Sequence, residues 1–209
     1  MFDSSAIHGL YLLTRECADD QRLLSGVRAA LRGGARVVQY RDQSGDRLRQ
    51  QRQAGALLAL CQDFAVPLII NDDVALAALI GANGVHLGAG DTDLATARGM
   101  LGAAAIIGLS CYDDLMRARG AVAAGADYVA FGAFFASRTK PLARPCDLTL
   151  LSESAGLTRP RVAIGGIDAA NAGELIAAGA SALAVLAGVW DSPDPEAAAR
   201  AIAQQFPSP

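Results

Sequence analysis

The stretch Val66-Pro-Leu-Ile-Ile-Asn71-Asp72 decides the fold together with its counterpart Gly84-Val-His-Leu-Gly-Ala-Gly-Asp91. Each begins with an apolar run of about the right length for a buried strand, and each ends in polar residues that a core would reject. A buried carboxylate is costly unless something pairs with it. Two carboxylates at one rim of a sheet suggest a bound cation, and their oxygens suit Mg²⁺. The first hypothesis is therefore a site that handles phosphate groups.

Short apolar runs of this kind alternate with longer Ala/Leu-rich segments of helical period along the chain. The predicted strands lie at 8–14, 35–41, 67–72, 84–88, 104–110, 127–132, 161–166 and 181–187. The predicted helices lie at 20–32, 46–64, 73–80, 92–101, 113–124, 148–156, 169–178 and 195–205. This alternation predicts a parallel sheet, and the length fits one (β/α)₈ barrel domain over residues 1–209. An open doubly wound sheet is the alternative topology.

The pair Gly-Ala recurs beside alternate predicted strands. It stands at Gly34-Ala35, Gly81-Ala82, Gly125-Ala126 and Gly179-Ala180. A glycine that ends a helix explains each pair on its own. The recurrence favours a repeated unit of two strand–helix modules, and such a repeat supports a closed barrel.

Composition narrows the class of protein. The chain has 209 residues, 52% of them hydrophobic, and a net charge of -3 without any polybasic block, so nucleic acid is not an expected partner. The four cysteines are scattered without a Cys-x-x-Cys pair, which argues against a zinc site and for reduced thiols. No apolar run reaches the roughly 18 residues that span a bilayer. We expect a cytoplasmic protein without membrane contact.

Polar residues at the ends of the first predicted strands are the candidate site. Gln39 and Arg41 share one face of the second strand by period two. An inward arginine is costly without an anion, although a salt bridge to Asp42 or Asp72 is the alternative. Asp72 is the candidate metal ligand after the third strand, beside Asn71. Asp91 is either a second ligand or a helix cap.

Later strand ends offer anion contacts. Ser110 ends the fifth strand without a G-x-S-x-G elbow, and His86, inside an apolar strand, is expected to be a structural core histidine. The loop at 137–140 concentrates two hydroxyls and two cations, which suits a phosphate clamp, with a solvated loop as the alternative. Small-residue turns at 165–166 and 186–188 could present backbone N–H groups to a phosphate.

Five motifs stand in a fixed order along the chain: Gln39-x-Arg41, Ile70-Asn71-Asp72, Gly84-Val-His-Leu-Gly88 with Asp91, Ser137-x-Thr139-Lys140, and Ala163-Ile-Gly-Gly-Ile167. In this order, and nearly from end to end, the chain resembles the thiamine-phosphate synthase family. The resemblance implies a (β/α)₈ barrel and a transferase that joins a hydroxymethylpyrimidine diphosphate to a thiazole phosphate with Mg²⁺. The family is thought to react dissociatively, with diphosphate leaving first.

The resemblance also implies residue roles. The metal ligands would be Asp72 and Asp91, and the catalytic residues would be Arg41, Ser110 and Lys140. The pyrimidine diphosphate contacts would be Gln39, Arg41, Asn71, Ser110 and Lys140. The thiazole phosphate contacts would be Ser137, Thr139, Gly166 and the backbone of Leu186 and Ala187. Neighbouring residues of the same motifs complete the expected substrate site: Tyr40, Asp42, Gln43 and Arg138.

Three departures from the family pattern keep other functions open. Gln43 stands where Lys is usual, Asp73 replaces a frequent Arg, and Ala187 replaces a common Ser. The loss of positive charge leaves a non-catalytic thiamine-pathway binding protein as one alternative. A thiazole tautomerase relative is another, but those relatives use a histidine near the end of the fifth strand, and Ser110-Cys111-Tyr112 contains none. The oligomeric state, a homo-oligomer included, stays open.

Overall fold

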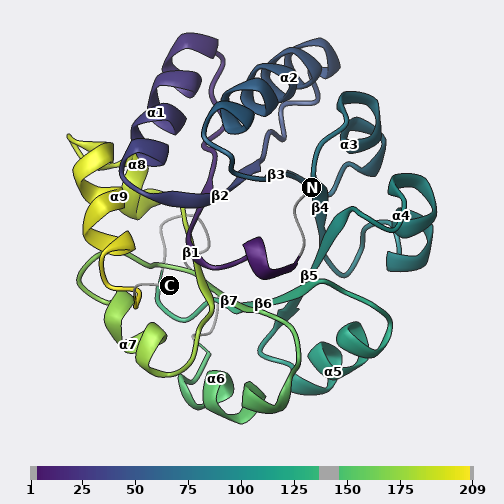
Figure 1. The fold of residues 1–209 in the computed structure, drawn as a ribbon, viewed down its shortest axis with the longest axis vertical. Coiled ribbons are helices and arrows are strands. Elements are labelled where there is room, and N and C mark those ends of the chain that lie inside the picture. Colours follow the sequence, from purple (N-terminus) through teal and green to yellow (C-terminus); the bar gives the residue numbers. More distant parts are fainter. Residues whose placement is uncertain (1–3, 137–145, 208–209) are drawn as a thin grey trace.

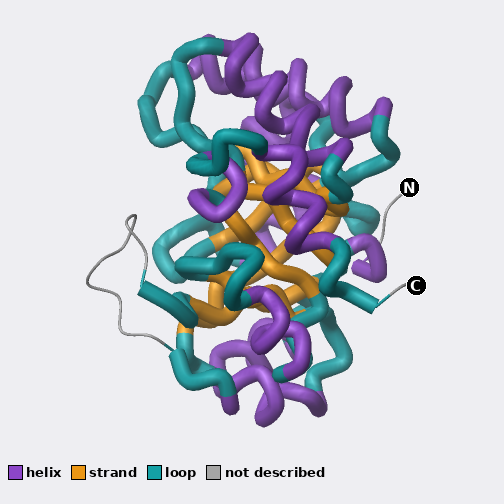
Figure 2. The backbone as a smooth tube through the Cα atoms, turned by 90° about the vertical axis from the view of Figure 1, so that its left-hand side faces the viewer, coloured by secondary structure: helices purple, strands orange, loops and turns teal. Residues whose placement is uncertain are grey.

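Eight parallel strands form a closed barrel in the computed structural model, which describes residues 4–136 and 146–207. Helices follow the strands and surround them on the outside, as Figure 1 shows from one end and Figure 2 from the side. The first strand pairs in parallel with both the second and the eighth, which closes the sheet. The predicted (β/α)₈ barrel is confirmed, and the open sheet is excluded.

The described elements follow the predicted order. The strands are β1 Gly9–Leu13, β2 Ala35–Tyr40, β3 Leu68–Asn71, β4 Gly84–Leu87, β5 Ile106–Tyr112, β6 Tyr128–Gly132, β7 Arg161–Ile164 and β8 Ala182–Val185. The helices are η1 Ser4–Ala6, α1 Asp20–Arg32, α2 Arg47–Asp63, α3 Val74–Ile80, α4 Leu94–Leu101, α5 Leu115–Ala123, α6 Thr149–Glu153, η2 Ser154–Gly156, α7 Ala172–Ala177, α8 Ala187–Trp190 and α9 Pro195–Ala203.

Every predicted strand has at least one bound that differs from the observed one by one or two residues, and the differences at β5 and β8 affect candidate site residues. β5 starts later than predicted and continues to Tyr112, with a register irregularity against β6 after Ser110. β8 ends at Val185, so Ala187 begins the short helix α8 and does not end a strand. Helix α8 has four residues, too few for a 3.6-residue period to appear in the sequence.

Local signals mark both ends of the helices. Six helices begin after an aspartate whose side chain accepts a backbone N–H of the first turn: Asp19, Asp46, Asp73, Asp93, Asp114 and Asp194. The four Gly-Ala glycines follow helices with φ between 69° and 105°. Only glycine adopts this region at little cost, so helix termination explains each pair directly.

Side chains alternate between two cores along each strand. One cluster fills the barrel with residues such as Tyr11, Val37, Ile69 and Tyr128, and a larger one lies between the strands and the helices. Ile7, just after η1, is buried with the inner cluster. Since it precedes β1, it closes the amino-terminal end of the barrel, and any site must open at the carboxyl end. None of the described helices is long and apolar enough to cross a membrane.

The last helices hold the first strand in place. The indole Nε1 of Trp190 in α8 donates to the carbonyl of Leu13, at 2.7 Å, across 177 positions of sequence. The ring lies over Gly26 of α1, where an added Cβ would come within 2.3 Å of it. Helix α9 packs on α1 as well. The two ends of the described chain are therefore joined by side-chain packing in addition to strand pairing.

A glycine inside the barrel provides a stability test. A Cβ at Gly108 would come within 1.9 Å of the Tyr128 ring, although its backbone does not require glycine. We expect Gly108→Ala to lower the free energy of unfolding by about 1–3 kcal/mol through overpacking. Urea unfolding followed by circular dichroism measures the change.

The matched control is Gly120→Ala on the exposed face of α5, where nothing lies within 4 Å of the added Cβ. This variant should gain about 0.5–1 kcal/mol because alanine favours the helix. Equal stabilities of the two variants would contradict the assigned packing of Gly108 against Tyr128.

Candidate active site

Four polar side chains come together inside the carboxyl end of the barrel. Gln39, Asn71 and Ser110 each lie two or four residues after an interior position of their own strand. Residues two apart on a strand share one face, so these three project inward. His86 of β4 is placed inside by its ring, which stacks on the interior Tyr128. The sequence predicted three of them as site residues and His86 as a core histidine.

Asp72 and Asp91 meet at the rim directly above this layer. Their carboxyl groups are within hydrogen-bonding reach of each other. The Asn71 amide donates to Asp72 at 2.5 Å, and the backbone N–H of Gly88 donates to Asp91 at 2.6 Å. Asp72 has a left-handed backbone with φ 60°, held by its N–H bond to the carbonyl of His86. Such strain in a residue other than glycine is typical of functional sites.

The two carboxylates disturb each other. Burial raises the pKa of Asp72 above its ordinary value, and the adjacent Asp91 carboxyl raises it further. Arg41 and Asn71 act in the opposite direction. A shared cation would remove the repulsion between two carboxylates held this closely.

The structure also decides how Asp91 is used locally. The sequence allowed it to cap the helix that follows, but the N-cap of α4 is Asp93, which accepts the backbone N–H of Thr96. Asp91 therefore remains exposed and turned toward Asp72. Asp73, in contrast, caps α3 through the N–H of Leu76.

The donor set fits Mg²⁺. The ion commonly takes one or two protein carboxylates and completes its shell with water and substrate phosphates. Within the described ranges, no group of three or more His, Cys, Asp or Glu side chains could hold a metal. Two carboxylates at an open rim match the expectation for Mg²⁺ bound together with a diphosphate.

Arg41 lies beside this pair at the end of β2. Its backbone N–H donates to the Thr14 hydroxyl at 2.9 Å, which fixes the chain as it leaves the strand. The guanidinium acts on the Asp72 carboxyl through its charge, and it makes no ion pair within the described part of the chain. The alternative of a salt bridge to Asp42 is wrong, because Asp42 pairs with Arg49 at 2.9 Å.

Tyr40 and Asp42 require a correction. The Tyr40 ring is buried on the outer side of β2, and its hydroxyl donates to Gln53 of α2 at 2.9 Å. The Asp42 side chain is only 1% exposed and accepts two hydrogen bonds from Arg49. Both residues hold α2 against the barrel, so we remove them from the expected substrate contacts. Gln43 is exposed near the rim, and its N–H donates to Glu16.

His86 is connected to Ser110 within the polar layer. Its Nε2 lies 2.9 Å from the Ser110 hydroxyl, and its Nδ1 lies 3.0 Å from the hydroxyl of Tyr128. Burial lowers the pKa of His86 to about 4, against a smaller opposing effect of Asp91, so the imidazole is neutral at neutral pH. Sequence reasoning missed this connection and the part of Tyr11 and Tyr128, because the partners lie far apart in the chain.

The turns after β7 and β8, across the same carboxyl end of the barrel, have the small residues expected for a phosphate cradle. Gly166 has φ 64°, and a Cβ there would lie 2.5 Å from the carbonyl of Ala136. A Cβ at Gly188 would lie 2.3 Å from the carbonyl of Ile167. Leu186 and Ala187 enter α8 beside this turn. The predicted contacts Ser137, Arg138, Thr139 and Lys140 lie outside the described residues.

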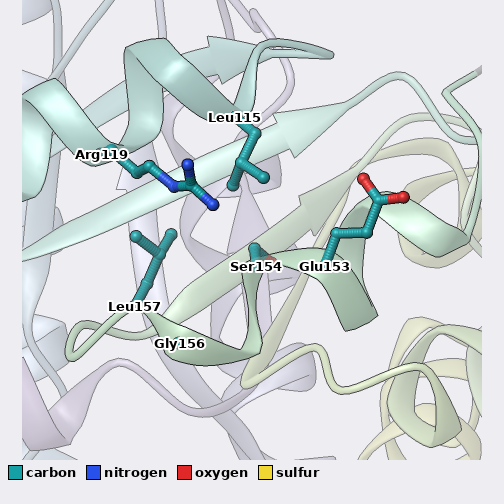
Figure 3. Close-up of a pocket in the computed structure, with 6 residues that line it drawn as sticks. All are labelled: Leu115, Arg119, Glu153, Ser154, Gly156 and Leu157. Carbon is teal, nitrogen blue, oxygen red and sulfur yellow. The ribbon is translucent and has the colours of Figure 1, made fainter.

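A separate hollow lies on the outer wall of the barrel. It is formed by side chains of α5 and by the segment from α6 through η2, as Figure 3 shows for Leu115, Arg119, Glu153, Ser154, Gly156 and Leu157. None of the predicted site residues lines it. It is therefore distinct from the rim that carries the carboxylates.

Comparisons with known proteins show which family the chain belongs to. Residues 10–189 match the family described as "Thiamine monophosphate synthase". The thiamine-phosphate synthase of Chromobacterium violaceum is 54% identical over 200 residues, covering 96% of this chain and 97% of that protein. The corresponding protein of Thiobacillus denitrificans is also 54% identical, over 95% of this chain and 94% of its own.

A solved structure gives the same result. The thiamine phosphate pyrophosphorylase of Pyrococcus furiosus superposes with a TM-score of 0.85 at 29% identity, over 97% of this chain and 96% of that one. A 3-hexulose-6-phosphate synthase at 17% identity and a TM-score of 0.69 shares the fold alone. The closed barrel, the family match over residues 10–189 and the 54% identity over nearly the whole chain lead to one conclusion: the chain belongs to the thiamine monophosphate synthase family.

Proposed function

We infer that this chain is a thiamine-phosphate synthase, a transferase that joins a hydroxymethylpyrimidine diphosphate to a thiazole phosphate and releases diphosphate. The observation that carries the inference is identity of about half of all residues, over nearly the whole chain, to relatives with that name. The rim geometry supports it, since a cation site, an arginine and a glycine turn suit two phosphorylated substrates.

Asp72 and Asp91 would hold Mg²⁺, which supplies charge neutralisation for the diphosphate. Arg41 lies close enough to act on the Asp72 carboxyl, so the same region can take a phosphate oxygen of the substrate. Lys140, which follows β6 in the sequence, would add a second cation. Loss of a diphosphate needs no strong base, and charge stabilisation of the leaving group is the main requirement.

Asn71 and Ser110 would contact the pyrimidine diphosphate from the interior layer. The Asn71 amide also holds the Asp72 carboxyl, so it couples the metal ligand to the substrate pocket. Gln39 lies deeper, with only 4% of its surface exposed. On the other side, Gly166 and the start of α8 would receive the thiazole phosphate.

The charge lost by having Asp73 in place of arginine is partly offset within the fold. Arg47 of α2 forms an ion pair with Asp73, whose carboxylate also caps α3. Asp73 is thus neutralised by a neighbouring side chain and has a local structural purpose. For Gln43, the structure shows no comparable structural reason for the loss of charge, because the residue is exposed at the rim.

The proposed function is tested by incubating the purified protein with both substrates and Mg²⁺. We expect thiamine phosphate and diphosphate in equal amounts, detected by chromatography, and no product in excess EDTA. Unchanged activity in EDTA would exclude the metal requirement. Tight binding of thiamine phosphate without turnover would favour the non-catalytic binding protein.

The carboxylate pair is tested by Asp72→Asn, with Asp73→Asn as the matched control. The first change removes a proposed metal ligand, and we expect activity to fall by about 100-fold or more. The second keeps a good helix cap, so activity should stay near that of the parent. The activity of both variants is measured over a range of Mg²⁺ concentrations. Equal activities would argue against Asp72 as a ligand.

Gln43 is tested by Gln43→Lys, which introduces the charge that the family pattern leads us to expect at this position. A charged hydrogen bond is worth more than a neutral one, so we expect the KM for the pyrimidine diphosphate to fall by about tenfold at most. Gln43→Met controls for side-chain length without charge. A KM that does not change in the lysine variant would show that other cations already supply this contact.

A further inference from the structure

A continuous chain of hydrogen bonds crosses the interior of the barrel from β2 to β5. The Gln39 amide nitrogen donates to the Tyr11 hydroxyl at 2.9 Å, and that hydroxyl lies 2.8 Å from the hydroxyl of Tyr128. Tyr128 contacts His86 Nδ1 at 3.0 Å, and His86 Nε2 contacts Ser110 at 2.9 Å. One end of the chain lies deep in the barrel, and the other is the half-buried serine below the rim.

The donor at one end decides the direction of every bond. Tyr11 accepts from Gln39, so its own proton goes to Tyr128, the remaining partner that the described residues provide. The Tyr128 proton then goes to His86 Nδ1. A neutral imidazole with an accepting Nδ1 carries its proton on Nε2, which donates to Ser110. Reversing only the bond between the tyrosines would leave a buried hydroxyl proton without an acceptor.

Rotating the Gln39 amide group by 180°, so that its oxygen and nitrogen exchange places, reverses the direction of every hydrogen bond in this series. The amide oxygen would then accept from Tyr11, the protons would all shift in the other direction, and Ser110 would donate to His86 Nε2. The serine could then only accept from a substrate. A diphosphate oxygen is itself an acceptor, so only the first direction lets Ser110 donate to it.

We propose that His86 is the positioning residue for Ser110: as the Nε2–H tautomer, it donates to the serine oxygen and leaves the serine proton free for an acceptor atom of the pyrimidine diphosphate. This rests on the proposed function, in which Ser110 contacts that substrate. Stacking on the Tyr128 ring, at 5.5 Å between ring centroids, holds the imidazole plane in this orientation. Tyr11 and Tyr128 transmit the direction set by Gln39.

The tautomer can be measured directly, without substrate. The chain has two histidines, and the other, His8, is exposed. His8→Gln therefore leaves a single histidine, whose two ring nitrogens are separated by ¹⁵N chemical shift in selectively labelled protein. We expect the proton on Nε2 at neutral pH. A proton on Nδ1 would overturn the proposal, whether or not the protein makes thiamine phosphate.

Positioning is tested by a cycle of variants. A glutamine amide nitrogen can take the place of Nε2, whereas an asparagine amide ends near Nδ1 and cannot reach Ser110. We expect His86→Asn to lower kcat/KM for the pyrimidine diphosphate by about tenfold, with His86→Gln recovering most of it. In a Ser110→Ala background, His86→Asn should change kcat/KM less than about twofold.

Additive losses in the double variant would overturn the positioning of Ser110 by His86, because independent effects on the fold add. The KM for the thiazole phosphate serves as the internal control and should stay unchanged in all variants. Should His86→Asn fail to fold, the tautomer measurement in the His8→Gln protein decides the proposal on its own. Absence of turnover in the parent protein would contradict the proposed function, while the tautomer measurement still decides the direction of the chain.

Discussion

Hydrogen bonding between β1 and β8 is the constraint on which the rest of the structure depends. Once the sheet closes, each strand has one face inside the barrel and one toward the helices. Which side chains point inward cannot change without shifting the whole strand by one residue. Gln39, Asn71, His86 and Ser110 therefore share one interior layer although four different strands carry them. The pairing of β3 with β4 sets the carboxylates that follow these two strands side by side at the rim.

The sequence predicted the barrel well because its signals are local. Apolar runs, aspartate caps and terminal glycines each act within a few residues, and β1 to β8 appear where they were expected. Tyr40 was misassigned although the period-two argument for Gln39 and Arg41 already put it on the opposite, outward face of β2. Asp42 was misassigned because nothing local shows that it pairs with Arg49 of α2. Asp91 could not be resolved either, since Asp91 and Asp93 are equally plausible caps by spacing alone.

The polar residues inside the barrel show that contacts between residues far apart in the chain cannot be predicted from local sequence. His86 sits in an apolar strand, which correctly predicts burial, but its partners stand 24 and 42 positions further along the chain. Only the register between β4, β5 and β6 brings them together. A residue can thus be structural in its burial and functional in its contacts. The contact with His86 also strengthens the assignment of Ser110 to the substrate site, because it fixes the direction in which the serine hydroxyl donates its proton.

Trp190 and its bond to Leu13 have a consequence for how the protein is made. During synthesis on the ribosome, β1 emerges early and has one unpaired edge until β8 arrives about 170 residues later. The indole that fastens β1 comes later still. The nascent chain therefore carries an open strand of residues that are all buried in the folded protein, and until β8 arrives the fold itself does not cover that edge.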